Sequence, residues 1–81
     1  MPSKASDAVD VAARHFVYKL YEATDGRPSE QRALREMNEE IETVLRSVGR
    51  GWITLHGAGS KLLERSVALT EEGRRLARKG R

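Results

Sequence analysis

The chain has no cysteine among its 81 residues, so neither a disulfide framework nor a thiolate site can form. It also has no long apolar run. The longest uninterrupted stretches are three residues, whereas a helix that crosses a bilayer needs roughly 18–20. The first ten residues hold no apolar stretch of signal-peptide length. These absences predict a soluble, cytoplasmic protein with no membrane partner.

Side chains that commonly perform chemistry are equally sparse. The only histidines, His15 and His56, are far apart in the sequence, and each is interpreted as a surface or partly packed ring. The glutamates between residues 39 and 42 are interpreted as a solvated helix face rather than an acid–base pair. The stretch "GAGSK" lacks the full phosphate-loop frame and does not lead from a strand into a helix, so it is interpreted as a turn. The sequence therefore predicts no enzyme, no cofactor and no metal site.

The positive charge is concentrated at the end of the chain. Residues 1–60 carry eight Lys or Arg against nine acids, whereas residues 61–81 carry seven against three. A basic segment is typical of proteins that bind polyanions such as nucleic acid, although basic ends also serve only to keep proteins soluble.

A first helix is expected over Ala5–Thr24. Its apolar residues recur at spacings of three and four, which is typical of a helix that buries one face. Gly26 and Pro28 end it. Val11 and Tyr18 fall on the opposite side, where a homodimer contact is one interpretation and scattered surface apolar residues are the other. The residues expected on the buried face are Val9, Ala13, Phe16, Val17, Leu20 and Tyr21.

A second helical segment is expected over residues 29–48, with Ser29 as its N-cap. Its apolar stripe stays in phase from start to finish and contains no Gly or Pro. One continuous helix is therefore favoured over two helices, and Asn38 is the only candidate break. The residues expected in the stripe are Leu34, Met37, Ile41, Val44, Leu45 and Val48.

A β-hairpin is expected next, with strands over Trp52–His56 and Leu62–Leu69 joined by a glycine-containing loop. In the second strand, Leu63, Val67 and Leu69 are expected to share the buried face. Thr70 is expected to cap a short third helix that ends in basic residues. The prediction is a single small α+β domain over residues 1–81, ordered helix, helix, hairpin, helix, with residues 1–5 and 79–81 frayed.

The segment "GRGWITLHGAGSKLLERSVALTEEGRRL" resembles the wing half of small bacterial winged-helix proteins. The matching features are a Gly-aromatic-aliphatic step at Gly51, a two-stranded wing, and an "LT-x-x-G-R" step from Leu69 into the last helix. The exit "LYEATDGRP" from the first helix is similar to that of short uncharacterised bacterial proteins. The resemblance covers about two thirds of the chain.

The resemblance implies sequence-specific DNA binding in transcription or on a mobile element, by a dimer whose recognition helix enters the major groove. The recognition residues would lie between Asn38 and Arg46, and the wing positions would include His56 and Ser60. The residues that the resemblance and the basic end together nominate for DNA contact are Thr43, Arg46, Ser47, Arg50, Lys61, Arg65, Arg74, Arg75, Arg78 and Lys79, with Arg81 in the same tail.

Two features of the sequence oppose major-groove docking. A helix-turn-helix needs two helices, and the 29–48 segment favours one. If the segment breaks at Asn38, the recognition helix begins with Glu39, Glu40 and Glu42, which would face phosphates whose neutralisation drives DNA affinity. The alternative is a winged-helix-like module that binds protein without binding DNA, through its acidic helix face or through Trp52.

Overall fold

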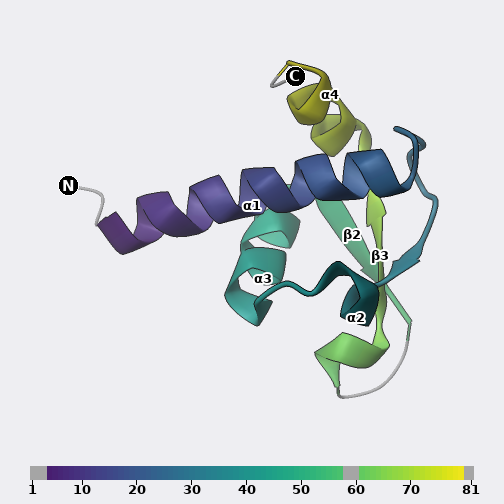
Figure 1. Cartoon of the computed structure of the whole chain (residues 1–81), viewed down its shortest axis with the longest axis horizontal. Helices are drawn as coiled ribbons and strands as arrows, with labels where there is room; N and C mark the ends of the chain where they lie inside the picture. Colours follow the sequence, from purple (N-terminus) through teal and green to yellow (C-terminus); the bar gives the residue numbers. More distant parts are fainter. Residues whose placement is uncertain (1–3, 58–60, 80–81) are drawn as a thin grey trace.

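The architecture is a small α+β domain, seen in a computed structural model that describes residues 4–57 and 61–79 (Figure 1). A three-stranded antiparallel sheet and four α-helices make up the described part. The elements in chain order are α1 (Lys4–Ala23), β1 (Arg32–Ala33), α2 (Leu34–Met37), α3 (Ile41–Gly49), β2 (Ile53–His56), the 3₁₀ turn η1 (Leu62–Glu64), β3 (Ser66–Leu69) and α4 (Glu71–Lys79). The α+β prediction is confirmed.

Helix α1 is the longest element and forms one wall of the core. Its expected buried face is confirmed at Ala13, Phe16, Val17 and Leu20, which are fully buried. Tyr18 differs from expectation: it is half-buried and packs against the core rather than pointing away from it. The reason is that α2, α3 and α4 all pack against α1, so the helix is covered over more than one stripe.

The end of α1 forms as the sequence predicts. Thr24 donates its hydroxyl to the Leu20 carbonyl oxygen at 2.9 Å, and the Gly26 N–H donates to the Tyr21 carbonyl oxygen at 2.8 Å. Gly26 has a φ of 72°, a left-handed value that glycine adopts at little cost. The chain therefore reverses beside Tyr21 and runs back toward the sheet.

The prediction of one continuous helix over residues 29–48 is wrong. The segment contains β1, α2 and α3, and Asn38 between the two helices has a left-handed φ of 51°. Asparagine is one of the few residues other than glycine that enters this region readily, so it can end α2. Ser29 is not a helix cap: it has a φ of 70°, and its N–H donates to the Leu69 carbonyl oxygen at 3.1 Å.

The break at Asn38 also changes which residues are buried. Leu34, Met37 and Val44 lie in the core as expected. Ile41 and Leu45 do not, because α3 takes a new direction after the break and no longer continues the stripe of α2. Each of these two side chains is 51% exposed. Their placement in the core was a wrong prediction.

The sheet has the order β1-β3-β2, and both pairings are antiparallel. In the hairpin, Ile53 pairs with Leu69 and His56 pairs with Ser66. The expected hairpin is present, but its second strand is shorter than predicted, because residues 62–64 form the turn η1. Leu63 is consequently 48% exposed instead of facing the core. The two-residue strand β1, which pairs with β3, was not predicted.

The predicted cap of the last helix is confirmed. The Gly73 N–H donates to the Thr70 hydroxyl oxygen at 3.0 Å, and the Thr70 hydroxyl donates to the Gly51 carbonyl oxygen at 2.5 Å. Gly73 is buried directly against the main chain of Trp52, where a Cβ would fall well inside contact distance of the Trp52 carbonyl oxygen. This close approach holds α4 against the start of the hairpin.

Both ends of the chain were expected to fray. In the structure α1 begins at Lys4 and α4 ends at Lys79, so residues 4, 5 and 79 belong to helices, and the other residues expected to fray lie outside the described part. No helix in residues 4–57 or 61–79 is long and apolar enough to span a bilayer.

Candidate interaction surface

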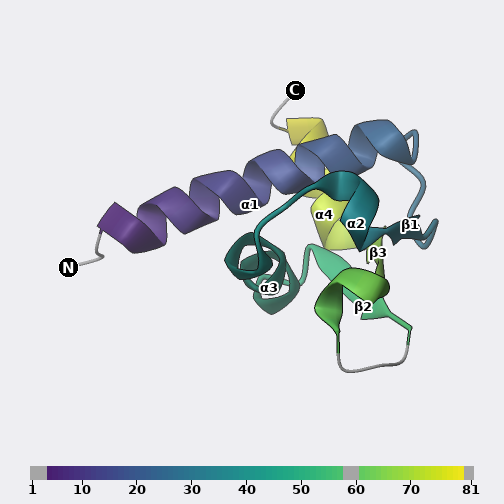
Figure 2. The ribbon, with the colours of Figure 1, turned by 60° about the horizontal axis from the view of Figure 1, so that its bottom comes forward.

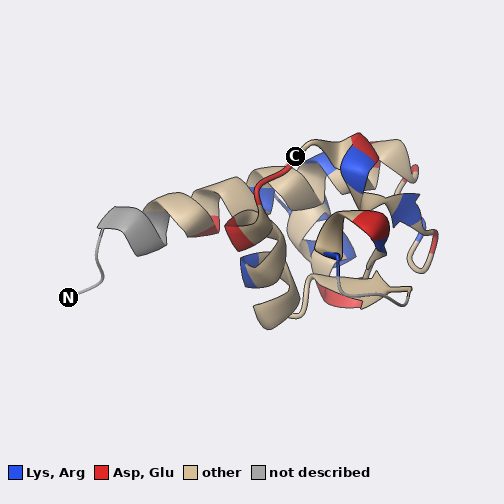
Figure 3. Cartoon of the chain, turned by 90° about the horizontal axis from the view of Figure 1, so that it is seen from below, with Lys and Arg blue, Asp and Glu red and all other residues tan. Residues whose placement is uncertain are grey.

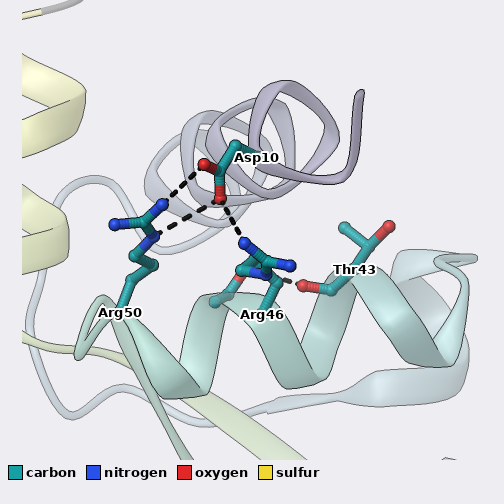
Figure 4. Close-up of polar contacts among 5 residues, drawn as sticks. Asp10, Thr43, Arg46 and Arg50 are labelled. Carbon is teal, nitrogen blue, oxygen red and sulfur yellow. Dashed lines mark hydrogen bonds and ion pairs between the residues drawn. The ribbon is translucent and has the colours of Figure 1, made fainter. Parts of the chain in front are cut away.

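Asp10 on α1 binds two arginines, Arg46 of α3 and Arg50, which directly follows that helix (Figure 4). Its Oδ1 accepts a hydrogen bond from Arg46 Nη1 at 3.1 Å, and its Oδ2 accepts one from Arg50 Nη2 at 2.6 Å. A further contact joins Arg50 Nε to Oδ1 at 3.3 Å. Arg46 and Arg50 were nominated for DNA contact; here they lie between α1 and α3 and fasten the two helices together.

The pKa of Asp10 is lowered from its ordinary value of 3.8. The largest cause is the hydrogen bond from Arg50, partly opposed by desolvation. The positive charges of Arg50 and Arg46 add to the lowering. The carboxylate is therefore ionised throughout the neutral range, and it balances one of the two guanidinium charges beside it.

Thr43 and Ser47, the other nominated residues of α3, face the interior. Thr43 is 6% exposed and Ser47 is fully buried. The Ser47 hydroxyl donates to the Thr43 carbonyl oxygen at 2.9 Å, one turn earlier in the same helix. Neither hydroxyl can reach a duplex while α3 remains packed against α1, so the structure places these two candidates in the core and not at a surface.

The outward face of α3 is apolar and acidic. Ile41 and Leu45 lie one turn apart on this face, and Glu42 is exposed beside them. Two shallow hollows border the face. One, of about 430 Å³, lies toward η1, and the other, of about 330 Å³, lies toward α1. The first is lined by Arg35, Ile41, Lys61, Leu62, Leu63 and Glu64, and the second by Val9, Glu42, Leu45, Arg46 and Gly49.

The nominated wing residues lie around η1 and the hairpin. Lys61 is exposed and directly precedes η1. Arg65 is half-buried, and its carbonyl oxygen accepts the Leu34 N–H at 3.0 Å. His56 is half-buried at the end of β2, where its Nε2 lies 2.8 Å from the Thr54 hydroxyl. Ser60 lies outside the described residues.

The nominated residues of α4 divide into two pairs. Arg74 and Arg75 form ion pairs with glutamates three positions earlier, at 3.6 Å to Glu71 and 3.0 Å to Glu72. Arg78 and Lys79 are exposed, and neither makes an ion pair with another residue that the structure describes. Arg81 lies outside the described residues. The free positive charge of α4 is therefore at its C-terminal end.

The basic residues do not gather on one face. In Figure 3, Lys and Arg are interspersed with Asp and Glu along the ribbon. In Figure 1 the hairpin end with η1 and the helix α4 lie at opposite ends of the fold, and in Figure 2 the C-terminal end of α4 emerges on the side of α1 that is away from η1. Lys61 and the end of α4 thus belong to separate surfaces, whereas the charge pattern of the sequence grouped them.

A third hollow, of about 320 Å³, lies where α4 meets the start of the hairpin. Trp52 is half-buried there, and the hollow contains one acid and two basic residues. Its lining residues are Trp52, Glu72, Arg75, Leu76 and Lys79. Nowhere in the described ranges do three or more His, Asp or Glu side chains gather closely enough to hold a metal ion.

The sequence reasoning missed Asp10 and the outward role of Ile41 and Leu45. An acid at position 10 among the apolar residues of a helix gave a weak signal for an ion-pair partner on another element. The position of Asn38, as a residue that can end a helix, was the stronger signal for the new direction of α3.

No protein-family model, curated protein or solved structure matches this chain.

Proposed function

We propose that this chain is a winged-helix-like interaction module that binds protein, rather than DNA, through the outward face of α3. The winged-helix part is supported by the succession of two short helices broken at Asn38, an antiparallel hairpin and a capped last helix. The single observation that carries the protein-binding part is the composition of α3: its exposed side chains are Ile41, Glu42 and Leu45.

DNA and protein partners differ in the groups that they present to α3. A DNA duplex presents a dense row of phosphates, and Lys and Arg side chains that release its counterions supply most of the affinity. Arg46 of α3 and Arg50 just after it already share the carboxylate of Asp10, and Glu42 would add repulsion. A protein surface instead offers apolar area. Ile41 and Leu45 are half exposed. Binding that removes their apolar surface from water is favourable by about 25 cal/mol per Å² of buried area.

The test is an NMR titration of the whole chain with a random-sequence duplex, combined with cross-linking. We expect the backbone amides of residues 41–49 to keep their chemical shifts. A photo-reactive amino acid at position 45 should cross-link to polypeptide in cells that express the chain. The matched control places the same group at Val11, which is 52% exposed on α1. Salt-sensitive shifts along α3, or equal cross-linking at both positions, would overturn the proposal.

DNA contact through α4 is the second candidate, favoured by Arg78 and Lys79, which are exposed at the end of that helix and make no ion pair with another described residue. We expect such binding to be weak and largely independent of sequence, because only phosphate contacts are available to these side chains.

A fluorescence titration with duplex DNA at two salt concentrations tests this second candidate. Replacing Arg78 and Lys79 together by alanine should reduce the slope of log K against log salt by about two, since each phosphate contact contributes roughly 0.9. Lys61→Ala, at the other end of the fold, is the control and should leave the slope unchanged. Flat, negligible binding of the original chain at low salt would rule out this candidate.

A further inference from the structure

Three of the four most exposed large apolar side chains in the described part of the chain lie around α3. They are Ile41, Leu45 and Leu63, and we refer to them as the α3 stripe. Ile41 and Leu63 line the hollow toward η1, and Leu45 lines the hollow toward α1, so the stripe is continuous across both. Its members are half-exposed, although their residue types are most often buried.

The two flanks of the stripe differ in the charged side chains that make no ion pair with another described residue, which are cations on one flank and a carboxylate on the other. Toward η1 lie Arg35 and Lys61, and neither makes an ion pair with any other described residue. Glu64 is the one acid among the described residues that line this hollow, so the lining carries a net positive charge. Toward α1 lies Glu42, which is likewise without an ion pair among the described residues. The arginine on that side, Arg46, is already paired with Asp10.

We propose that the α3 stripe binds a second copy of this chain, so that the protein forms a symmetric homodimer with the two stripes in contact. This inference rests on the proposed function, because it names the partner of the same face. A twofold interface joins one patch to itself and therefore needs a patch that is complementary to its own rotated image. An apolar stripe meets this condition when cations without an ion pair among the described residues, Arg35 and Lys61, lie on one side and such a carboxylate, Glu42, lies on the other.

The charges determine how the two copies are oriented. A twofold axis that runs along α3 exchanges the flanks, so Arg35 and Lys61 of each copy face Glu42 of the other. An axis perpendicular to α3 would place like charges opposite one another, which is unfavourable. The dimer therefore has its α3 helices side by side in the same direction, with two equivalent sets of ion pairs around an apolar centre.

The size of the stripe limits the strength of the dimer. A standard specific interface removes about 800 Å² of surface from each partner. The stripe and its two flanks come from two short elements of a protein whose whole accessible surface is 5374 Å². We therefore expect an association in the micromolar range, which sedimentation can measure directly.

The first experiment is analytical ultracentrifugation of the whole chain over a series of concentrations. We expect a monomer–dimer equilibrium. Leu45→Asp should weaken it at least tenfold, because the dimer would bury an unpaired carboxylate. Val11→Asp is the matched control, since Val11 is equally exposed but lies on α1, and it should leave the equilibrium unchanged. Circular dichroism checks that both variants are folded.

The second experiment reverses charges across the interface. Arg35→Glu and Glu42→Arg should each prevent self-association, because each variant places like charges opposite one another. An equimolar mixture of the two variants should form a heterodimer, since both sets of facing residues are then Glu opposite Arg. Recovery of association only in the mixture cannot come from misfolding of either variant.

Two results would overturn the dimer: a wild-type chain that is monomeric at every concentration, or association that Val11→Asp abolishes and Leu45→Asp does not. The second result would favour the α1 contact through Val11 and Tyr18. Neither result decides the proposed function, which fails instead if α3 responds to duplex DNA in the NMR titration. The two failures are therefore distinguishable.

Discussion

Asp10 is the residue that determines whether Arg46 and Arg50 are available to a partner. It pairs with two side chains that sequence reasoning assigned to a DNA contact, and both pairs join α1 to α3. Charge counted along a sequence does not distinguish an arginine that faces solvent from one that an acid 36 or 40 positions away already holds. The number of basic residues was therefore a poor guide to the number of free positive charges.

We expect Asp10→Asn to lower the thermal stability at neutral pH and to reduce its dependence on pH. The pKa of Asp10 is depressed in the folded protein, so its stabilising effect is fully present above the ordinary value of 3.8 and is lost as the pH falls through the lower, folded value. Thermal melts of both proteins from pH 7 down to pH 2 measure this. A difference in melting temperature between the two proteins that stays constant over the whole pH range would contradict the prediction.

Gly73 is required for stability because the main chain of Trp52 leaves no space for a side chain at this position. In an exposed helix interior, replacing Gly by Ala stabilises by about 1 kcal/mol. At Gly73 the new methyl group would overlap the main chain of Trp52, and such overpacking costs about 1–3 kcal/mol. We expect Gly73→Ala to lower the free energy of unfolding in urea.

Gly49→Ala is the matched control, because nothing lies within 4 Å of the position that its Cβ would take. This substitution should raise the free energy of unfolding by about 0.4–1 kcal/mol. If both glycine substitutions changed stability in the same direction, the close approach of α4 to Trp52 would not be the deciding factor.

The separation of α2 from α3 depends on the single left-handed residue between them. We expect Asn38→Gly to leave stability nearly unchanged, whereas Asn38→Ala should reduce it by about 1 kcal/mol, since a left-handed conformation is costly for a residue with an ordinary Cβ. Urea unfolding of the two variants measures the difference. An alanine variant as stable as the glycine variant would mean that the backbone at residue 38 carries no strain.

Elements with a strong local signal were predicted well. The core face of α1, the hairpin and the Thr70 cap follow from short-range spacing and hydrogen-bond chemistry, which a sequence displays directly. The break at Asn38 and the strand β1 were not predicted. Ile41 and Leu45 continue the apolar pattern of Leu34 and Met37 in phase, and a two-residue strand is defined only by its pairing with β3, more than 30 residues later.

The surface proposed for binding was not predicted either, because its residues follow the same apolar pattern as the core. Hydrophobic residues at helical spacing predict a face that is buried. They do not show whether that face is buried in the protein's own core or against a partner. Ile41, Leu45 and Leu63 were all assigned to the core, and all three are about half exposed. Only the direction of α3 in three dimensions separates Ile41 and Leu45 from Val44, which is fully buried. Leu63 is exposed because residues 62–64 form η1 instead of continuing the strand.

For the molecule as a whole, the proposed dimer links stability to concentration. A ligand that binds only the folded state raises the melting temperature, and here the ligand is a second folded copy. We expect the melting temperature to rise with protein concentration for the wild-type chain and for Val11→Asp, and to stay constant for Leu45→Asp. Differential scanning calorimetry at several concentrations measures this. Parallel behaviour of all three proteins would contradict the dimer.

The central position of β3 has a consequence for how the chain acquires its structure. Within the described residues, both other strands pair only with Ser66–Leu69, and the Ser29 and Leu34 amides also donate to carbonyl groups at Leu69 and Arg65. During synthesis, then, the segments that precede β3 emerge from the ribosome without the strand that aligns them. The sheet can close only after Leu69 has been released, so it forms late in the synthesis of this domain.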